Sequence, residues 1–135
     1  MSIYWNTFTI MFVNNTGFDL ALNTPQIISG TVQSALPVPK NTQSPGLKAF
    51  FGQSSSDSTS GASGYAKWTT PDGVTCNVYY NAPNTGDPAG LPTLDGINAG
   101  NYKFTATKPT CSGSGCDINS GYRGYTMTVT LDSNS

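Results

Sequence analysis

Paired carboxylates are the residues of this chain whose type and spacing could support catalysis, since two such groups can divide acid and base work between them. Asp87 and Asp95 lie in one segment, and Asp72 lies in a turn that precedes it. Each of the three is followed by glycine or proline, which is typical of a turn rather than of a catalytic pair. We therefore interpret all three as turn residues.

The chain contains no histidine, and its seven acidic residues are all aspartates. Imidazole bases, histidine-activated nucleophiles and histidine metal ligands are thereby excluded. Asp117–Gly121 begins like a calcium-binding loop but lacks further aspartates and the bidentate glutamate. There is also no glycine-rich phosphate loop and no nucleophile elbow. We expect no catalytic residues, no bound metal and no cofactor, and therefore a protein that is not an enzyme.

The three cysteines allow one disulfide, and the sequence does not decide whether it forms. Cys111 and Cys116 flank Ser-Gly-Ser-Gly, a flexible loop that a small bridge could close, with a stabilisation of roughly 2 kcal/mol in the chain-entropy model. Whether it forms depends on the compartment, which the sequence does not specify. Cys76 lies in an expected strand, where we interpret it as a small buried hydrophobe.

Low charge narrows the choice of partners. Charged residues make up 10% of the chain, against about 25% in an average domain. Six basic residues and a net charge of −1 are too few for nucleic-acid binding. The N-terminal residues lack the basic start of a signal peptide and alternate like a strand. We therefore expect a soluble protein that is cytosolic, stored in inclusions or released non-classically, in which an Asn14-Asn15-Thr16 glycosylation signal has no role.

Alternating apolar and polar residues predict an all-β fold with no significant helix. The clearest hairpin flanks Pro71-Asp72-Gly73, and the first and last strands could pair with each other. We expect one domain, residues 1–135, built as an antiparallel β-sandwich or a small barrel, with long loops at Gln53–Gly64, Asn81–Asn101 and Cys111–Gly124. The expected strands are Ile3–Val13, Phe18–Leu22, Gly46–Gly52, Tyr65–Thr70, Val74–Tyr80, Asn101–Thr107 and Tyr125–Leu131, with Ile27–Val32 as a further segment that could pair.

Aromatic residues supply the remaining candidates for a binding surface. Phe8, Phe12, Phe51 and Phe104 fall on strand faces that we assign to the core. Tyr79 and Tyr80 are adjacent, so a strand directs them to opposite faces, and we expect Tyr79 to point outward. An uncharged surface with Tyr, Trp, Asn, Ser and Thr suits either a lipid headgroup region or a sugar.

Several segments, in their order and spacing, resemble the aegerolysin family. They are Val13–Leu22, then Ser60–Tyr65 leading into the hairpin, then Val78-Tyr79-Tyr80-Asn81-Ala82-Pro83 with Gly86, and the final strand Tyr125–Leu131. Within that family the chain is most similar to the bacterial branch, the small component of binary insecticidal crystal toxins.

The resemblance implies a non-enzymatic β-sandwich that recognises membrane lipids, often sphingolipids, and that acts with a larger pore-forming partner as a two-component cytolysin. Carried over residue by residue, it implies lipid binding by Trp68, Tyr79, Tyr80 and Asn81. The weakly charged surface makes homo-oligomers plausible. Two alternatives stay open at this point: a small lectin-like module that binds carbohydrate, and a structural or storage protein that assembles with itself.

Overall fold

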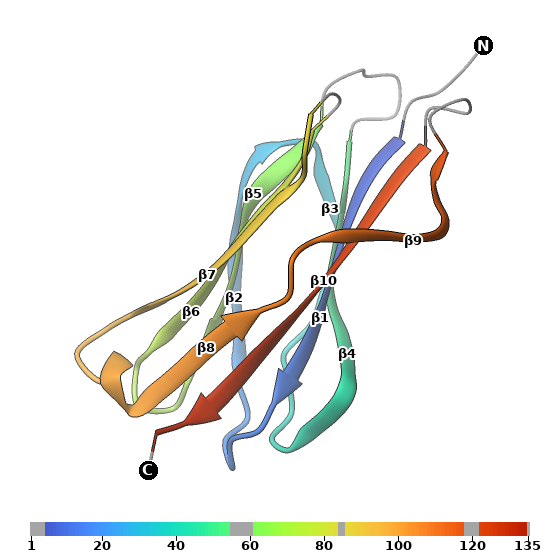
Figure 1. Ribbon diagram of the computed structural model, residues 1–135. Helices are drawn as coiled ribbons and strands as arrows, with labels where there is room; N and C mark the ends of the chain where they lie inside the picture. Colours follow the sequence, from blue (N-terminus) through green and yellow to red (C-terminus); the bar gives the residue numbers. More distant parts are fainter. Residues whose placement is uncertain (1–4, 55–60, 84–85, 118–121, 135) are drawn as a thin grey trace.

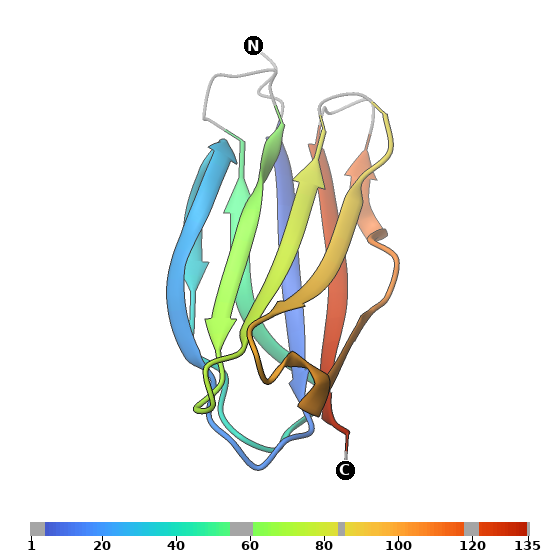
Figure 2. The same cartoon turned by 90° about the vertical axis from the view of Figure 1, so that its left-hand side faces the viewer.

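The computed structural model describes residues 5–54, 61–83, 86–117 and 122–134, with side chains at all of these except 5, 112–117 and 122. Two sheets pack face to face (Figures 1 and 2). The predicted all-β sandwich is therefore confirmed. In the described ranges the helical content is a single 3-10 turn, η1 (Ala99–Asn101), and no helix there has the length and apolar character needed to cross a bilayer.

The six-stranded sheet is built around the two ends of the chain. Its order is β3-β4-β1-β10-β8, with β9 also paired to β10. The expected pairing of the first and last strands is confirmed, but these strands lie in the middle of the sheet, and they run parallel, with Phe8 opposite Tyr125. The strands are β1 (Trp5–Asn14), β3 (Thr31–Ala35), β4 (Thr42–Gln53), β8 (Tyr102–Ala106), β9 (Thr110–Asp117) and β10 (Tyr122–Ser133).

The four-stranded sheet contains the predicted hairpin. Its order is β2-β5-β6-β7 and all of its pairs are antiparallel. The Pro71-Asp72-Gly73 turn joins β5 to β6, and Gly73 adopts a positive φ of 86°, which glycine tolerates without a Cβ clash. The strands are β2 (Ala21–Ser29), β5 (Ala62–Thr69), β6 (Thr75–Ala82) and β7 (Ala89–Asp95).

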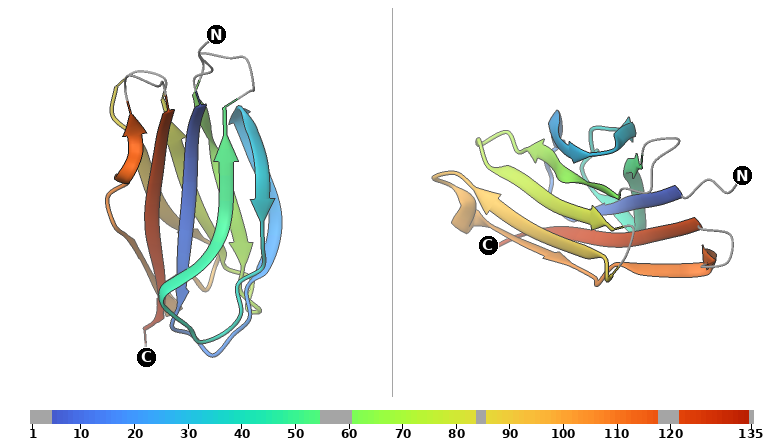
Figure 3. Two further views of the ribbon diagram at one scale, coloured as in Figure 1. Left: turned by 90° about the vertical axis from the view of Figure 1, so that its right-hand side faces the viewer. Right: turned by 90° about the horizontal axis from the view of Figure 1, so that it is seen from above.

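Three strand expectations were wrong. β7 lies inside the expected loop Asn81–Asn101, because it is an edge strand and an edge strand tolerates a proline such as Pro92. β9 lies inside the expected loop Cys111–Gly124, where it pairs with a longer β10. The expected strand Phe18–Leu22 is replaced by β2, which begins at Ala21, continues past Pro25 and is also an edge strand (Figure 3).

Side chains from the inner faces of both sheets form one core. Phe12 packs edge-on against Trp68, with ring centroids 5.0 Å apart, and stacks on Phe104 at 5.6 Å. Phe50, fully buried, occupies the place expected for Phe51, because a register shift between Ile10 and Met11 in the β1–β4 pair changes which residues point inward. Burying one such aromatic side chain contributes about 1.5–3 kcal/mol.

Four connections meet at one end of the sandwich, which is at the bottom of Figure 1 and which we call the lower end. They are residues 15–20, 36–41, 70–74 and 96–101, and the chain's C-terminal residues lie beside them. Backbone hydrogen bonds link two of them, since Leu20 and Val38 exchange N–H···O bonds of 2.8 and 3.1 Å. The lower end is therefore a cluster of short loops, two of which are joined by backbone hydrogen bonds.

Candidate functional site

Two of the expected lipid-binding aromatics are core residues. Trp68 is 0% exposed, and its indole N–H donates a 2.8 Å hydrogen bond to the carbonyl of Leu36. Tyr80 is 1% exposed and packs on Phe50 with ring centroids 4.7 Å apart. Burial raises the pKa of Tyr80 to about 12. The expectation that Trp68 and Tyr80 contact a ligand is corrected, because neither side chain reaches the surface.

The other two expected residues lie outside the core. Tyr79 and Asn81 alternate with Tyr80 on β6 and are half-buried on the outer face of the four-stranded sheet. Tyr79 faces Tyr65 across the β5–β6 pair, with ring centroids 5.3 Å apart. The structure thus brings Tyr79 and Asn81 together on one face and separates them from Trp68.

Among the described side chains, one cysteine is disulfide-bonded and one is a free thiol. Cys111 is disulfide-bonded, and the side chain of Cys116, its expected partner, lies outside the described residues. Cys76 is a free thiol that is buried in the core. Burial, together with the negative charge of Asp72, raises the pKa of the Cys76 thiol to about 12. At neutral pH this thiol is protonated and unreactive.

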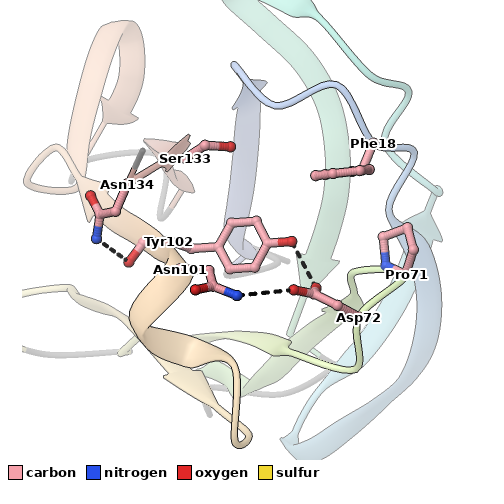
Figure 4. Close-up of a pocket in the computed structure, with 7 residues that line it drawn as sticks. All are labelled: Phe18, Pro71, Asp72, Asn101, Tyr102, Ser133 and Asn134. Carbon is pink, nitrogen blue, oxygen red and sulfur yellow. Dashed lines mark hydrogen bonds between the residues drawn. The ribbon is translucent and has the colours of Figure 1, made fainter.

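A hollow of about 550 Å³ opens at the lower end (Figure 4). It lies where the β1–β2 connection, the β5–β6 turn, the start of β8 and the end of β10 approach one another. One wall is apolar and the other is polar. Its lining residues are Phe18, Pro71, Asp72, Asn101, Tyr102, Ser133 and Asn134.

The polar wall is organised by the carboxylate of Asp72. Its Oδ1 accepts hydrogen bonds from the hydroxyls of Thr70 and Tyr102, the latter at 2.7 Å. Within the part of the chain that the structure describes, the contact of its Oδ2 is a long one of 3.5 Å with the Asn101 amide. The hydrogen bond from Thr70, and then that from Tyr102, hold the pKa of Asp72 below its usual value. Asp72 is therefore an exposed, fixed negative charge.

Asparagine side chains hold this wall in place. Asn98 Nδ2 donates to the carbonyl of Asp72 at 3.0 Å, which attaches the segment before η1 to the β5–β6 turn. Asn134 Nδ2 donates to the carbonyl of Tyr102 at 3.0 Å. Burial, and then the hydrogen bond to Asp72, raise the pKa of Tyr102, so its hydroxyl stays a donor at neutral pH.

The apolar wall is Phe18 with Pro71 (Figure 4). Phe18 is 46% exposed, although it is a large hydrophobic residue. Its loop is fixed by the buried amide of Asn14, which donates to the carbonyls of Phe18 at 2.8 Å and of Pro39 at 3.1 Å. The side-chain amide of Asn14, which is the acceptor residue of the glycosylation signal, is thus engaged in structural hydrogen bonds.

A second exposed apolar side chain lies at the same end. Ile97 is 99% exposed in the connection between β7 and η1. The preceding residue, Gly96, approaches the backbone of Gly73 and Val74, so this connection lies against the β5–β6 turn. Phe18 and Ile97 therefore project from the loop cluster that contains the hollow.

The remaining aspartates do not form a pair. Asp95 accepts a 2.6 Å hydrogen bond from the amide of Asn77 on the sheet face, and Asp87 lies exposed before β7. Within the described ranges no three acidic or cysteine side chains cluster in a way that could hold a metal ion. The turn signature around Asp72 gives no indication of this site, because Tyr102 is 30 positions away in the sequence.

Comparison with known proteins identifies the fold. No family model matches the sequence, and a search of curated proteins finds no significant match. Among solved structures, IP-1A from Alcaligenes faecalis is similar with a TM-score of 0.55 and 17% identity over 98% of this chain and 92% of that chain. The RahU protein, solved in complex with a Tris molecule, is similar with a TM-score of 0.58 and 13% identity over 98% and 96%. At these identities the likeness shows a shared fold.

Proposed function

We propose that this chain is a non-enzymatic, membrane-lipid-binding protein of the aegerolysin type, and that it docks onto membranes through its lower end. The observation that carries the proposal is the hollow that is lined both by the carboxylate of Asp72 and by the exposed ring of Phe18. The position differs from the hairpin residues that the family resemblance implied, since two of those are buried.

Exposed apolar side chains supply the membrane contact. Phe18 and Ile97 project from the same loop cluster, and burying a side chain of this size contributes about 1.5–3 kcal/mol when it is complete. Phe and other large apolar side chains insert at the boundary between the headgroups and the acyl chains, as they do on interfacial amphipathic helices. The two side chains together support shallow, reversible insertion.

The hollow supplies the headgroup contact. Asp72 keeps its negative charge at neutral pH, and its Oδ2 has no short hydrogen bond among the described residues. It can therefore accept a hydrogen bond from the primary ammonium of ethanolamine, and it attracts the quaternary ammonium of choline by charge alone. The rings of Phe18 and Tyr102 line the same hollow and can attract a cation through their faces. We assign the hollow to the choline or ethanolamine part of a sphingolipid headgroup.

The partner follows from the family resemblance. We propose that the membrane-bound protein presents a larger pore-forming protein to the bilayer, as one component of a two-component cytolysin, and that copies associate on the membrane. The low charge of the chain, with six basic and seven acidic residues, supports such association because it leaves little repulsion between copies.

Vesicle co-sedimentation tests the lipid proposal. Sphingomyelin and phosphatidylcholine share the choline that we assign to the hollow, so vesicles of either should sediment the protein, whereas phosphatidylglycerol, which lacks an ammonium group, should sediment none. The sphingolipid preference that the family resemblance implies should make vesicles with sphingomyelin sediment more protein than phosphatidylcholine alone. Ile97→Ser should lower sedimentation, whereas Ile28→Ser, an isoleucine 59% exposed near the opposite end, should not. Equal sedimentation with all vesicles, or with none, would contradict the proposal.

A further inference from the structure

The outer face of the four-stranded sheet carries a cross-strand row of apolar and aromatic side chains. Tyr65, Tyr79 and Leu91 stand opposite one another on β5, β6 and β7. The tyrosine rings are 5.3 Å apart and tilted by 53°, and Leu91 is 58% exposed. Residues directly opposite on paired strands share a face, so the three form a continuous stripe across the sheet.

Polar side chains border this stripe on both sides. Two residues along each strand toward the lower end, the row becomes Lys67, Asn77 and Thr93. Two residues in the other direction the row contains the polar Ser63 and Asn81 on β5 and β6, and the small apolar Ala89 on β7. An aromatic stripe between rows of amide, hydroxyl and ammonium groups fits a ligand that is apolar on its flat face and polar around its edge.

The dimensions of the patch match a sugar ring. Neighbouring strands lie about 4.8 Å apart, so the stripe is about 10 Å long, and successive rows are about 7 Å apart. Because the two tyrosine rings are tilted by 53°, a pyranose ring stacked on one of them would contact the other with its edge. Its equatorial hydroxyls would then point toward the flanking rows. A disaccharide would extend along the stripe to Leu91.

The polar groups beside the stripe are held in position. Asn77 is 7% exposed, and its Nδ2 donates to Oδ2 of Asp95 at 2.6 Å, which fixes the plane of the amide. Lys67 lies opposite Asn77 on β5. Lys67 and Asp95 carry opposite charges on this face and sum to zero, so the face favours a neutral ligand over an anionic one.

We propose that this face is a second binding site, distinct from the lower end, and that its ligand is a neutral saccharide stacked on Tyr65 and Tyr79. A second copy of the chain fits less well. The three rows cover roughly 200 Å² by their strand spacings, whereas a stable protein interface buries about 800 Å² on each partner.

Backbone amide NMR with soluble neutral oligosaccharides tests this site. The probes are glucose and N-acetylglucosamine oligomers and galactose- and mannose-terminated oligosaccharides. We expect at least one of them to shift amide signals of β5, β6 and β7, and Tyr79→Ala to weaken its binding by about tenfold or more. Tyr79→Phe, which keeps the ring, should retain most of the affinity.

Phe51→Ala is the matched control. Phe51 is also a half-buried aromatic residue near a lysine, with Lys48 Nζ 4.5 Å from its ring centroid, but it lies on the six-stranded sheet. It should leave sugar binding unchanged, as should Phe18→Ser at the lower end, so the outcome is independent of the lipid proposal. The inference is overturned if no probe shifts these signals, if Phe51→Ala weakens binding equally, or if Tyr79→Ala instead abolishes a concentration-dependent self-association.

Discussion

The hydroxyl of Tyr102 donates a 2.7 Å hydrogen bond to Oδ1 of Asp72, and this bond joins the first residue of β8 to the β5–β6 turn. Tyr102 belongs to the six-stranded sheet, and Asp72 lies in a turn of the four-stranded sheet. The contact therefore joins the two sheets at the lower end. It also leaves Oδ2 of Asp72, a residue that lines the hollow, with no contact from the described residues shorter than the 3.5 Å one to Asn101. A structural bond on one carboxylate oxygen thus leaves the other oxygen of Asp72 for a ligand.

The Asp72 network predicts an acid-dependent loss of stability. Hydrogen bonds lower the pKa of Asp72 in the folded protein below its usual 3.8, so their stabilisation is present above that pH and is lost as the pH falls through the lowered value. Asp72→Asn should therefore be less stable than the parent at neutral pH, with the difference narrowing in acid. Urea unfolding at a series of pH values measures this, and a difference that stays constant with pH would contradict it.

Stability should also fall at alkaline pH because of two buried groups. The pKa of Cys76 is raised from 9.0, and that of Tyr80 from 10.0, each to about 12. For a raised pKa the stabilisation is complete below the unfolded value and is lost as the pH rises toward the folded value. Cys76→Ala should cost stability at neutral pH through the smaller side chain, yet show a shallower decline above pH 9. Parallel alkaline declines in both proteins would count against this explanation.

Trp68 and Tyr79 should respond to substitution in opposite ways. Trp68→Ala removes a fully buried ring and leaves the Leu36 carbonyl without its donor, which should cost about 3–5 kcal/mol of stability. Tyr79→Ala removes a half-buried ring from an outer face, and most such substitutions cost about 1 kcal/mol. Chemical denaturation of both variants gives the comparison. Similar losses of stability would show that the two rings do not differ in burial as described.

Local sequence patterns were sufficient for the elements whose structure is determined locally. The Asp72-Gly73 turn, the alternation on either side of it and the opposed directions of Tyr79 and Tyr80 all depend on residues close together in the chain. The same alternation placed Tyr80 on one face with Cys76 and Val78, which are core residues. The transfer of lipid binding to Tyr80 came from the family resemblance and conflicted with that pattern.

The strand β7 and the contact between Asp72 and Tyr102 could not be predicted from the sequence, because both depend on the arrangement of the sheets. Pro92 excludes a central strand but not an edge strand, and only the strand order shows that β7 is at an edge. Likewise, nothing near Asp72 indicates that Tyr102 from the other sheet bonds to it. Turn chemistry explained why Asp72 is in a turn, whereas the three-dimensional structure was needed to show what the carboxylate faces.

The buried amide of Asn14 should be essential for the loop that presents Phe18. Its Nδ2 donates hydrogen bonds to the carbonyls of Phe18 and Pro39, and its Oδ1 accepts one from the backbone N–H of Thr16 at 3.0 Å. Asn14→Ala leaves the Thr16 N–H without its acceptor, at about 1–3 kcal/mol while it stays buried. It also removes one donor from each carbonyl, although Thr16 Oγ1 still donates to Phe18 at 3.3 Å and Thr42 Oγ1 to Pro39 at 2.6 Å. We expect a large loss of stability and weaker vesicle binding, whereas Asn15→Ala at the exposed neighbouring position should change little. Unchanged vesicle binding by a folded Asn14→Ala protein would show that the loop does not depend on this amide.

The close approach of β7 to the core can be tested by a pair of substitutions, because the second should recover part of the stability that the first removes. A Cβ at Gly90 would overlap Sδ of Met127, which is fully buried on β10. Gly90→Ala should therefore destabilise the protein by about 1–3 kcal/mol through overpacking, and Met127→Ala by about 2–5 kcal/mol through a cavity. In the double variant the added methyl group occupies part of that cavity, so the combined loss should be smaller than the sum of the two single losses. Strict additivity, measured by chemical denaturation, would mean that β7 moves away from the core in the Gly90 variant instead of pressing on Met127.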